Sequence, residues 1–134
     1  MEKTLVLLKP EIVAGGLMGK LISIYEEKGL KIEEMKLMLP TRELLEEHYA
    51  EHKEKPFFEE LVEYMTSGKV CVMEVSGEKA VETVRKLNGK TDPLEADAGS
   101  IRGRFAVSKS INAVHSSDCA ESAERELNLW FSKG

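Results

Sequence analysis

Two short apolar runs, residues 4–8 and 70–75, constrain the fold of this chain most strongly. The first is continuous and the second is broken only by Glu74, and short apolar runs of this kind are typical of buried strands. Pro10 ends the first run, because proline cannot donate a hydrogen bond to a sheet ladder. Each run is followed by a helical pattern and then by a second strand pattern, so the sequence predicts two consecutive strand–helix–strand units.

The first unit and the segment after it have clear boundaries. An amphipathic helix that follows two glycines ends at Gly29, where a left-handed residue is favoured. Residues 30–39 predict a strand, and a slip in its apolar alternation near 33–34 predicts a bulge. Thr41 is expected to cap a short helix, and Pro56 to lead into a second one.

The second unit is less regular. It predicts a helix over residues 80–88, a long ordered loop over 91–104 and a short strand over 105–107. A last helix is expected from about residue 119 to 131, with Asp118 and the glutamate three residues later as a capping box.

This order of elements predicts an α+β fold of the ferredoxin-like kind, a four-stranded antiparallel sheet with helices on one face. A chain of 134 residues and 15.0 kDa fits one domain, residues 1–134. With no secretory signal pattern and no long apolar stretch, the protein is expected in the cytoplasm, without a membrane partner.

The formal net charge of -5 limits the function classes. Affinity for nucleic acid comes mainly from a broad basic surface, so no nucleic-acid partner is required. A small phosphate ligand remains compatible with an acidic protein if a few cations meet in a pocket. Lys9, Arg85 and Arg102 border apolar segments and can converge in this way, although each alone is also compatible with an ordinary surface charge. The P-loop pattern is absent.

Three histidines are present, and His115 has the most suggestive context. It lies between an apolar segment and a predicted helix start, and a helix N-terminus attracts anions and favours a neutral, nucleophilic imidazole. A loop histidine with a backbone partner is the alternative, and context alone leaves both open. His48 and His52 lie in a charged stretch, and a solvated helix face is the favoured interpretation of His48.

Glu126 lies two to three turns into the last helix, beside its apolar stripe. A carboxylate there can accept a hydrogen bond from one ring nitrogen of His115 and leave the other nitrogen free. The alternative is that Glu126 is one of several surface charges.

Eight residues around His115, NAVHSSDC at positions 112–119, resemble the N-x-x-H-G-S-D-S active-site motif of nucleoside diphosphate kinases. Further motifs of that family occur in the same order along nearly the whole chain. They are KPE at 9–11, HY at 48–49, KPFF at 55–58, GKTDP at 89–93, SIRG at 100–103, SAERE at 122–126 and LWF at 129–131.

The resemblance implies a ferredoxin-like core and a ping-pong reaction. His115 would take the γ-phosphoryl group of a nucleoside triphosphate and pass it to a nucleoside diphosphate, with broad tolerance of base and sugar. Glu126 would orient the ring, and Ser117 would support that carboxylate. Lys9 and Tyr49 would stabilise the transferring phosphoryl group.

The resemblance also implies a nucleotide site drawn from the whole chain. Its members are Arg85, Thr91 and Arg102 for the distal phosphates, His52 for the α-phosphate, Asn112 with Lys9 for the sugar 3′-hydroxyl, and Phe57 with Leu61 for the base. Mg²⁺ would arrive with the nucleotide, without dedicated protein ligands. A homo-oligomer, a tetramer or a hexamer, is implied.

The sequence departs from the family pattern at four positions, where Glu11, Lys55, Ser116 and Cys119 replace Asp, Arg, Gly and Ser. A serine beside the nucleophile is expected either to strain the backbone or to crowd the phosphate. Two rival functions remain: a degenerate member that binds nucleotides or a partner protein without efficient transfer, and a regulatory ligand-binding module on the same fold.

Overall fold

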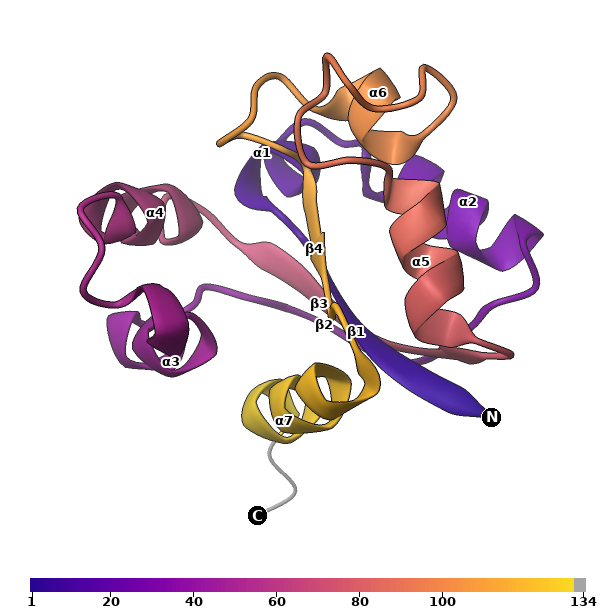
Figure 1. The fold of residues 1–134 in the computed structure, drawn as a ribbon, viewed down its shortest axis with the longest axis horizontal. Helices are drawn as coiled ribbons and strands as arrows, with labels where there is room; N and C mark the ends of the chain where they lie inside the picture. The colour runs from indigo at the N-terminus through magenta and orange to yellow at the C-terminus, as the bar shows by residue number, and fades with distance from the viewer. Residues whose placement is uncertain (132–134) are drawn as a thin grey trace.

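Four strands form one antiparallel sheet in the order β2-β3-β1-β4 (Figure 1). The computed structural model describes residues 1–131; residues 132–134, the end of the predicted domain, lie outside the described part. The strands are β1 (Glu2–Leu8), β2 (Lys31–Met38), β3 (Val70–Gly77) and β4 (Val114–Ser116). The two apolar runs of the sequence form β1 and β3, which are the two inner strands of the sheet. Apolar side chains suit these strands because both faces of each strand are covered.

The helices connect the strands and continue beyond the last one. They are α1 (Pro10–Ala14), α2 (Met18–Glu27), α3 (Arg42–His48), the 3₁₀ helix η1 (Ala50–His52), α4 (Phe58–Met65), α5 (Ala80–Asn88), α6 (Ile101–Phe105) and α7 (Ala120–Trp130). No helix among residues 1–131 is long and apolar enough to cross a membrane.

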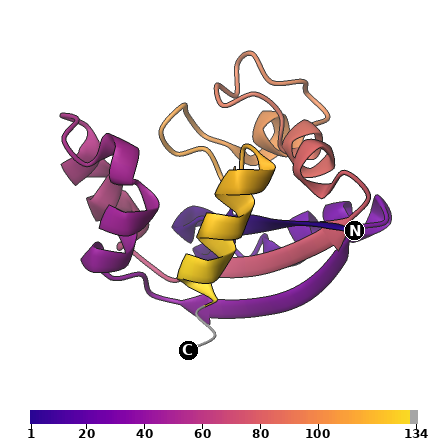
Figure 2. The ribbon, with the colours of Figure 1, turned by 60° about the horizontal axis from the view of Figure 1, so that its bottom comes forward.

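Helices cover both faces of the sheet, so the prediction that they lie on one face is wrong (Figures 1 and 2). Side chains alternate along β1, so that Val6 and Leu8 pack under α2 and α5 while Leu5 and Leu7 pack under α3, α4 and α7. The strand is apolar on both faces, and a single layer of helices would leave one of them in water.

Several local predictions are confirmed. Gly29 has a left-handed φ of 88°, and the β2–β3 register shifts between Ile32 and Glu34, where the bulge was expected. Thr41 Oγ1 accepts a hydrogen bond from Leu44 N at 3.1 Å and so caps α3. The cap of α7 differs from the prediction: the N-cap residue is Cys119, which makes no side-chain cap, and Asp118 is instead hydrogen-bonded to Ser122.

The segment before β4 also differs from the prediction. The expected strand over 105–107 and part of the expected loop are occupied by α6, whose first turn is capped by Ser100 Oγ accepting from Gly103 N at 3.1 Å. Ile101 and Phe105 are four residues apart and both pack into the core, which is a helical spacing. The fourth strand is β4, which pairs with β1 and places Leu7 opposite His115.

Candidate active site

A cavity of about 930 Å³ opens at the sheet edge formed by β4. Eleven of the twelve residues predicted for the site line it: Lys9, Tyr49, His52, Phe57, Leu61, Arg85, Thr91, Arg102, Asn112, His115 and Glu126. The twelfth, Ser117, is fully buried directly behind Glu126. The fold therefore brings into one place residues from nearly the whole length of the chain.

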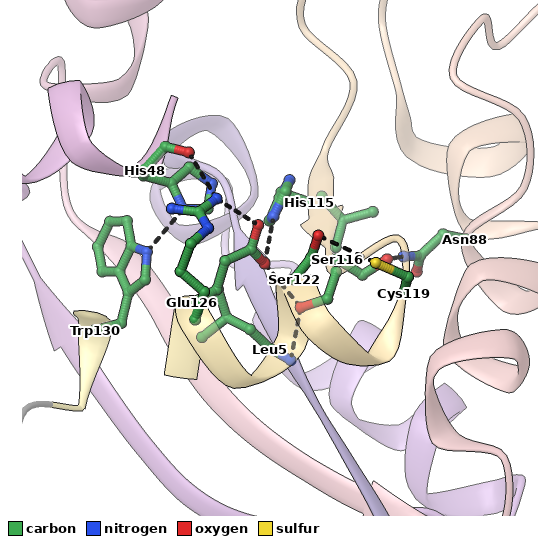
Figure 3. Close-up of polar contacts among 12 residues, drawn as sticks. Leu5, His48, Asn88, His115, Ser116, Cys119, Ser122, Glu126 and Trp130 are labelled. Atoms are coloured by element: carbon green, nitrogen blue, oxygen red, sulfur yellow. Dashed lines mark hydrogen bonds and ion pairs between the residues drawn. The ribbon is translucent and has the colours of Figure 1, made fainter. Parts of the chain in front are cut away.

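His115 lies at the centre of β4 and points toward α7, where it meets Glu126 (Figure 3). Its Nε2 is 3.2 Å from Glu126 Oε1, and Ser117 Oγ donates to the same oxygen at 2.7 Å. Ser117 Oγ also accepts from Leu5 N at 3.3 Å, which ties the group to β1. The Glu126 side chain is 6% exposed and that of His115 is 22% exposed, so the carboxylate is buried behind a ring that reaches the cavity.

This contact determines which ring nitrogen of His115 is available. The Glu126 carboxylate can only accept, so Nε2 must carry the ring proton and donate it. Nδ1 of the neutral ring then holds a free lone pair. The arrangement is that of an oriented nitrogen nucleophile.

Lys9 lies beyond the end of β1 and is only 6% exposed. Its Nζ donates to Asn112 Oδ1 at 2.7 Å, so these two predicted site residues are in direct contact. Burial, followed by the repulsion of Arg102, lowers the pKa of Lys9 to about 8, and Glu11 partly offsets the shift. A negatively charged ligand placed beside this ammonium would favour its charged form.

Arg102 connects three separate segments of the cavity wall. Its guanidinium donates to the carbonyl oxygens of Gly89 at 2.8 Å, Val114 at 2.7 Å and Asn112 at 3.3 Å. A guanidinium has five N–H groups, so two remain for a ligand. Arg102 therefore stabilises the cavity wall as well as lining it, a role that its position in the sequence did not reveal.

The turn before β4 has an unusual backbone. Ala113 has a left-handed φ of 74°, and its N–H donates to Glu11 Oε2 at 2.9 Å, while Tyr64 donates to the other oxygen of that carboxylate. A left-handed alanine is strained, and it persists only where the surroundings hold it. Ser116 lies in the extended strand β4, so the backbone strain expected there is wrong.

The other end of the cavity is aromatic. Phe57 is 47% exposed just before α4, with the His52 ring centroid 5.6 Å away and Leu61 lining the cavity nearby. Tyr49 lies between this end and His115, at a ring-centroid distance of 6.5 Å from each of the two histidines. Burial, and next the charge of Glu126, raises the pKa of the Tyr49 hydroxyl, so this group remains a neutral donor.

His48 is buried, so the expectation of a solvated helix face is wrong. Only 4% of it is exposed, its Nδ1 accepts from Trp130 Nε1 at 3.0 Å, and its ring centroid is 4.6 Å from that of His115. Burial, and next the charge of His115, lowers the pKa of His48 well below its usual value. Leu45 is also buried and lies three residues earlier, a helical spacing that pointed to this position.

Some polar cavity residues were not predicted from the sequence. They are Glu51, Lys86, Lys90, Asp118, Ser122 and Arg125. Arg125 donates to the carbonyl oxygens of Glu47 at 3.2 Å and His48 at 3.4 Å, and thereby joins α7 to the end of α3.

The cavity does not provide a convincing set of metal ligands. Among the described residues, His48, His115 and Glu126 are the one group of three possible ligands, with donor atoms within 4.8 Å of one another. His48 accepts from Trp130 at Nδ1, so its Nε2 carries the proton and has no lone pair to offer. The cavity is instead lined by several cations, among them Lys9, Arg85 and Arg102, which can hold anionic oxygens.

Comparisons with known proteins all give one family name. A family model described as nucleoside diphosphate kinase matches residues 2–134. The chain is 52% identical to a protein of that name from Brevibacillus brevis, and the match covers 98% of this chain and 90% of that protein. It is 54% identical to one from Pyrococcus abyssi, and that match covers 97% of this chain and 84% of the other protein. The fold superposes on the apo crystal structure of the nucleoside diphosphate kinase from Encephalitozoon cuniculi with a TM-score of 0.96 and 44% identity, over 99% of this chain and 90% of that one. It superposes on the crystal structure of the enzyme from Aquifex aeolicus with a TM-score of 0.94 and 40% identity, over 98% of this chain and 96% of that one.

Proposed function

Because the chain belongs to the nucleoside diphosphate kinase family, and so is a phosphotransferase that acts on nucleotides, we propose that it works by a ping-pong mechanism through a phosphohistidine at His115. The observation that carries the proposal is the hydrogen bond from His115 Nε2 to Glu126, which leaves Nδ1 free at the wall of a cavity rich in cations.

In the first half-reaction, His115 Nδ1 attacks the γ-phosphorus of a nucleoside triphosphate. The N–P bond forms while the bond from that phosphorus to the bridging oxygen breaks, and a nucleoside diphosphate leaves. The ring proton stays on Nε2, where Glu126 supports the positive charge that develops on the imidazole. In the second half-reaction, a terminal phosphate oxygen of another diphosphate attacks the phosphorus on His115. The O–P bond forms while the N–P bond breaks, so a nucleoside triphosphate leaves and the neutral ring is restored.

The other residues act mainly by position and charge, which supply most of the catalysis in phosphoryl transfer. Lys9 and Tyr49 contact the group in transit, and Lys9 with Asn112 binds the 3′-hydroxyl. Arg85, Thr91 and Arg102 bind the distal phosphates, and His52 binds the α-phosphate. Mg²⁺ held by phosphate oxygens would neutralise part of their charge.

Base tolerance follows from the aromatic end of the cavity. Phe57 and Leu61 offer a stacking face and an apolar contact, and every base has a π-face. Strong selection requires hydrogen bonds to base edges. The binding energy then comes mainly from phosphates and sugar, which all nucleotides share.

We also propose that the enzyme is a homo-oligomer and that a second copy packs against β2. This strand is an edge of the sheet, and Met35, Leu37 and Leu39 are all more than half exposed at alternating positions. An exposed apolar edge strand is a template for pairing with another chain. The apolar clusters on the two faces of the sheet both include side chains of β1. This supports a single domain, and we propose that this domain is the repeating unit of the oligomer.

The test is a two-substrate rate study of the wild-type protein. ATP is varied against GDP, CDP, UDP and one deoxynucleotide, with Mg²⁺ present. A ping-pong enzyme gives parallel lines in double-reciprocal plots, and we expect kcat/KM values within about tenfold to thirtyfold of one another. Binding without transfer would instead identify a degenerate family member, and a preference of several thousandfold would contradict the proposed base site.

A further inference from the structure

The strained turn before β4 connects two predicted site residues, Lys9 and Asn112. Ala113, which follows Asn112, is fully buried and has a left-handed φ of 74°. Its carbonyl oxygen accepts from Lys9 N at 2.9 Å, while Lys9 Nζ donates to Asn112 Oδ1 at 2.7 Å. The turn therefore sets the two side chains relative to each other, and a group that holds the turn also holds the pair.

The carboxylate of Glu11 on α1 holds this turn. Glu11 Oε2 accepts from Ala113 N at 2.9 Å, and Tyr64 on α4 donates its hydroxyl proton to the other oxygen. Burial, and next the hydrogen bond to Glu11, raises the pKa of Tyr64, so this hydroxyl stays protonated and donates. A left-handed alanine persists only where its surroundings hold it, and Glu11 supplies a side-chain contact to its backbone.

Glu11 also acts on Lys9 through its charge. Titratable groups face Lys9 from four elements: Glu11 of α1, His48 of α3, Tyr64 of α4 and Arg102 of α6. Arg102 is a cation and burial keeps His48 and Tyr64 neutral, so Glu11 is the negative charge among the four. Burial, and next Arg102, lowers the pKa of Lys9 to about 8, and the charge of Glu11 limits this shift.

We propose that Glu11 is a positioning residue that presents Lys9 and Asn112 to the nucleotide as one unit. Its hydrogen bond to Ala113 holds the turn between the two side chains, and its negative charge favours the ammonium form of Lys9. Glu11 is not part of the cavity lining, so it acts through these residues and not on the substrate. The inference rests on the function proposed above, in which Lys9 and Asn112 bind the 3′-hydroxyl.

The first experiment removes the charge of Glu11 and keeps its shape. In Glu11→Gln the amide oxygen can accept from Ala113 N and the amide nitrogen can donate to the Tyr64 hydroxyl, so the turn keeps its contacts. The protonation of Lys9 is followed by NMR of lysine labelled with ¹³C at Cε, and the resonance is assigned by its loss in Lys9→Arg. We expect the Lys9 midpoint to fall below its wild-type value, and kcat/KM at pH 8 to fall about threefold to tenfold.

Glu63→Gln is the matched control for this experiment. It removes the same charge at an exposed position of α4, one residue before Tyr64. The Lys9 midpoint and kcat/KM should both stay at their wild-type values, because a change in net charge alone is screened by solvent.

The second experiment releases the turn. Glu11→Ala leaves the amide of Ala113 without its acceptor, so the strained turn can relax and Asn112 can move away from Lys9. The readout is the ratio of kcat/KM for ADP to that for 3′-deoxy-ADP, which measures the contact with the 3′-hydroxyl. We expect the ratio to fall about threefold to tenfold, whereas a general loss of stability would lower both rates alike.

The outcomes separate this inference from the proposed function. An unchanged Lys9 midpoint in Glu11→Gln, or an unchanged ratio in folded Glu11→Ala, would overturn the assignment of Glu11. If Glu11→Ala does not fold, the midpoint in Glu11→Gln decides. The NMR titration needs no turnover, so it still tests Glu11 if the wild-type protein takes no label from γ-labelled ATP, the result that would overturn the proposed function.

Discussion

At the scale of single residues, the tautomer of His115 is the feature on which the proposed phosphoryl transfer depends. Glu126 accepts from Nε2, and Ser117, held by the backbone of β1, donates to the same carboxylate oxygen. The ring of His115 is therefore oriented by a contact that reaches back into the sheet. Removing the charge of the acceptor, while keeping its shape, tests this directly.

We expect Glu126→Gln to slow the labelling of His115 by about tenfold to a hundredfold, because a charge-assisted hydrogen bond of about 1.5–3 kcal/mol is lost. Nucleotide affinity should change little, since Glu126 contacts the ring. Single-turnover rates measure the effect, and Glu124→Gln, an exposed position two residues earlier, is the control. An unchanged rate in Glu126→Gln would mean that this carboxylate does not orient the nucleophile.

We expect the loss of the Lys9 charge to lower the activity at alkaline pH. Its pKa is lowered to about 8, so its positive charge is present below that pH and is lost as the pH rises through it. The pH profile of kcat/KM, which reports the free enzyme, should therefore fall with a midpoint near 8. Lys9→Arg should move the midpoint upward, because a guanidinium stays charged.

Lys90→Arg, a change in another lysine of the cavity wall, should keep the wild-type midpoint. If Lys9→Arg also keeps the wild-type midpoint, another group causes the fall of kcat/KM at alkaline pH, and the charge of Lys9 is not the one that the reaction requires.

At the scale of elements, the edge strand β2 is the surface on which the proposed homo-oligomer depends. A carboxylate at Leu37, in the middle of the exposed apolar row, should prevent a second copy from packing there, because it would be buried without a partner. We expect Leu37→Glu to reduce the molar mass measured by light scattering. Leu94→Glu, at a position 94% exposed away from β2, should leave it unchanged. A Leu37→Glu protein with the wild-type mass would place the interface elsewhere.

The elements also show what a sequence can and cannot predict. The inner strands β1 and β3 were predicted because their apolar runs are long and both faces are buried. The three-residue strand β4 was missed, since a strand that short has no measurable alternation and exists through its pairing with β1. Helix α6 was missed because its five residues include Gly103 and two arginines.

Most residues of the candidate site were predicted to lie together, and they do line one cavity, for a physical reason. Motif residues such as His115 and Arg85 are read from their types and order, without knowing the path of the chain between them. The roles of Arg102 and His48 were not accessible in this way, since they depend on carbonyl groups and rings brought together by tertiary packing.

At the scale of the whole molecule, the position of the cavity follows from covering both faces of one sheet. The helices α5 and α7 lie on opposite faces of the sheet, and β4 is the edge strand next to β1 (Figure 1). His115 on β4 thus meets Glu126 on one side, while Arg85 and Lys86 of α5 border the cavity on the other. We propose that a covalent phosphoryl group is carried at this point.

The most direct measurement is to incubate the protein with γ-labelled ATP and Mg²⁺, without an acceptor, and to map the label. We expect an acid-labile, base-stable label on His115 that a nucleoside diphosphate removes as triphosphate. Folded His115→Gln should take no label, whereas His52→Gln, a histidine of the same cavity, should still take it. Label on folded His115→Gln, or wild-type transfer without any labelled protein, would contradict the account.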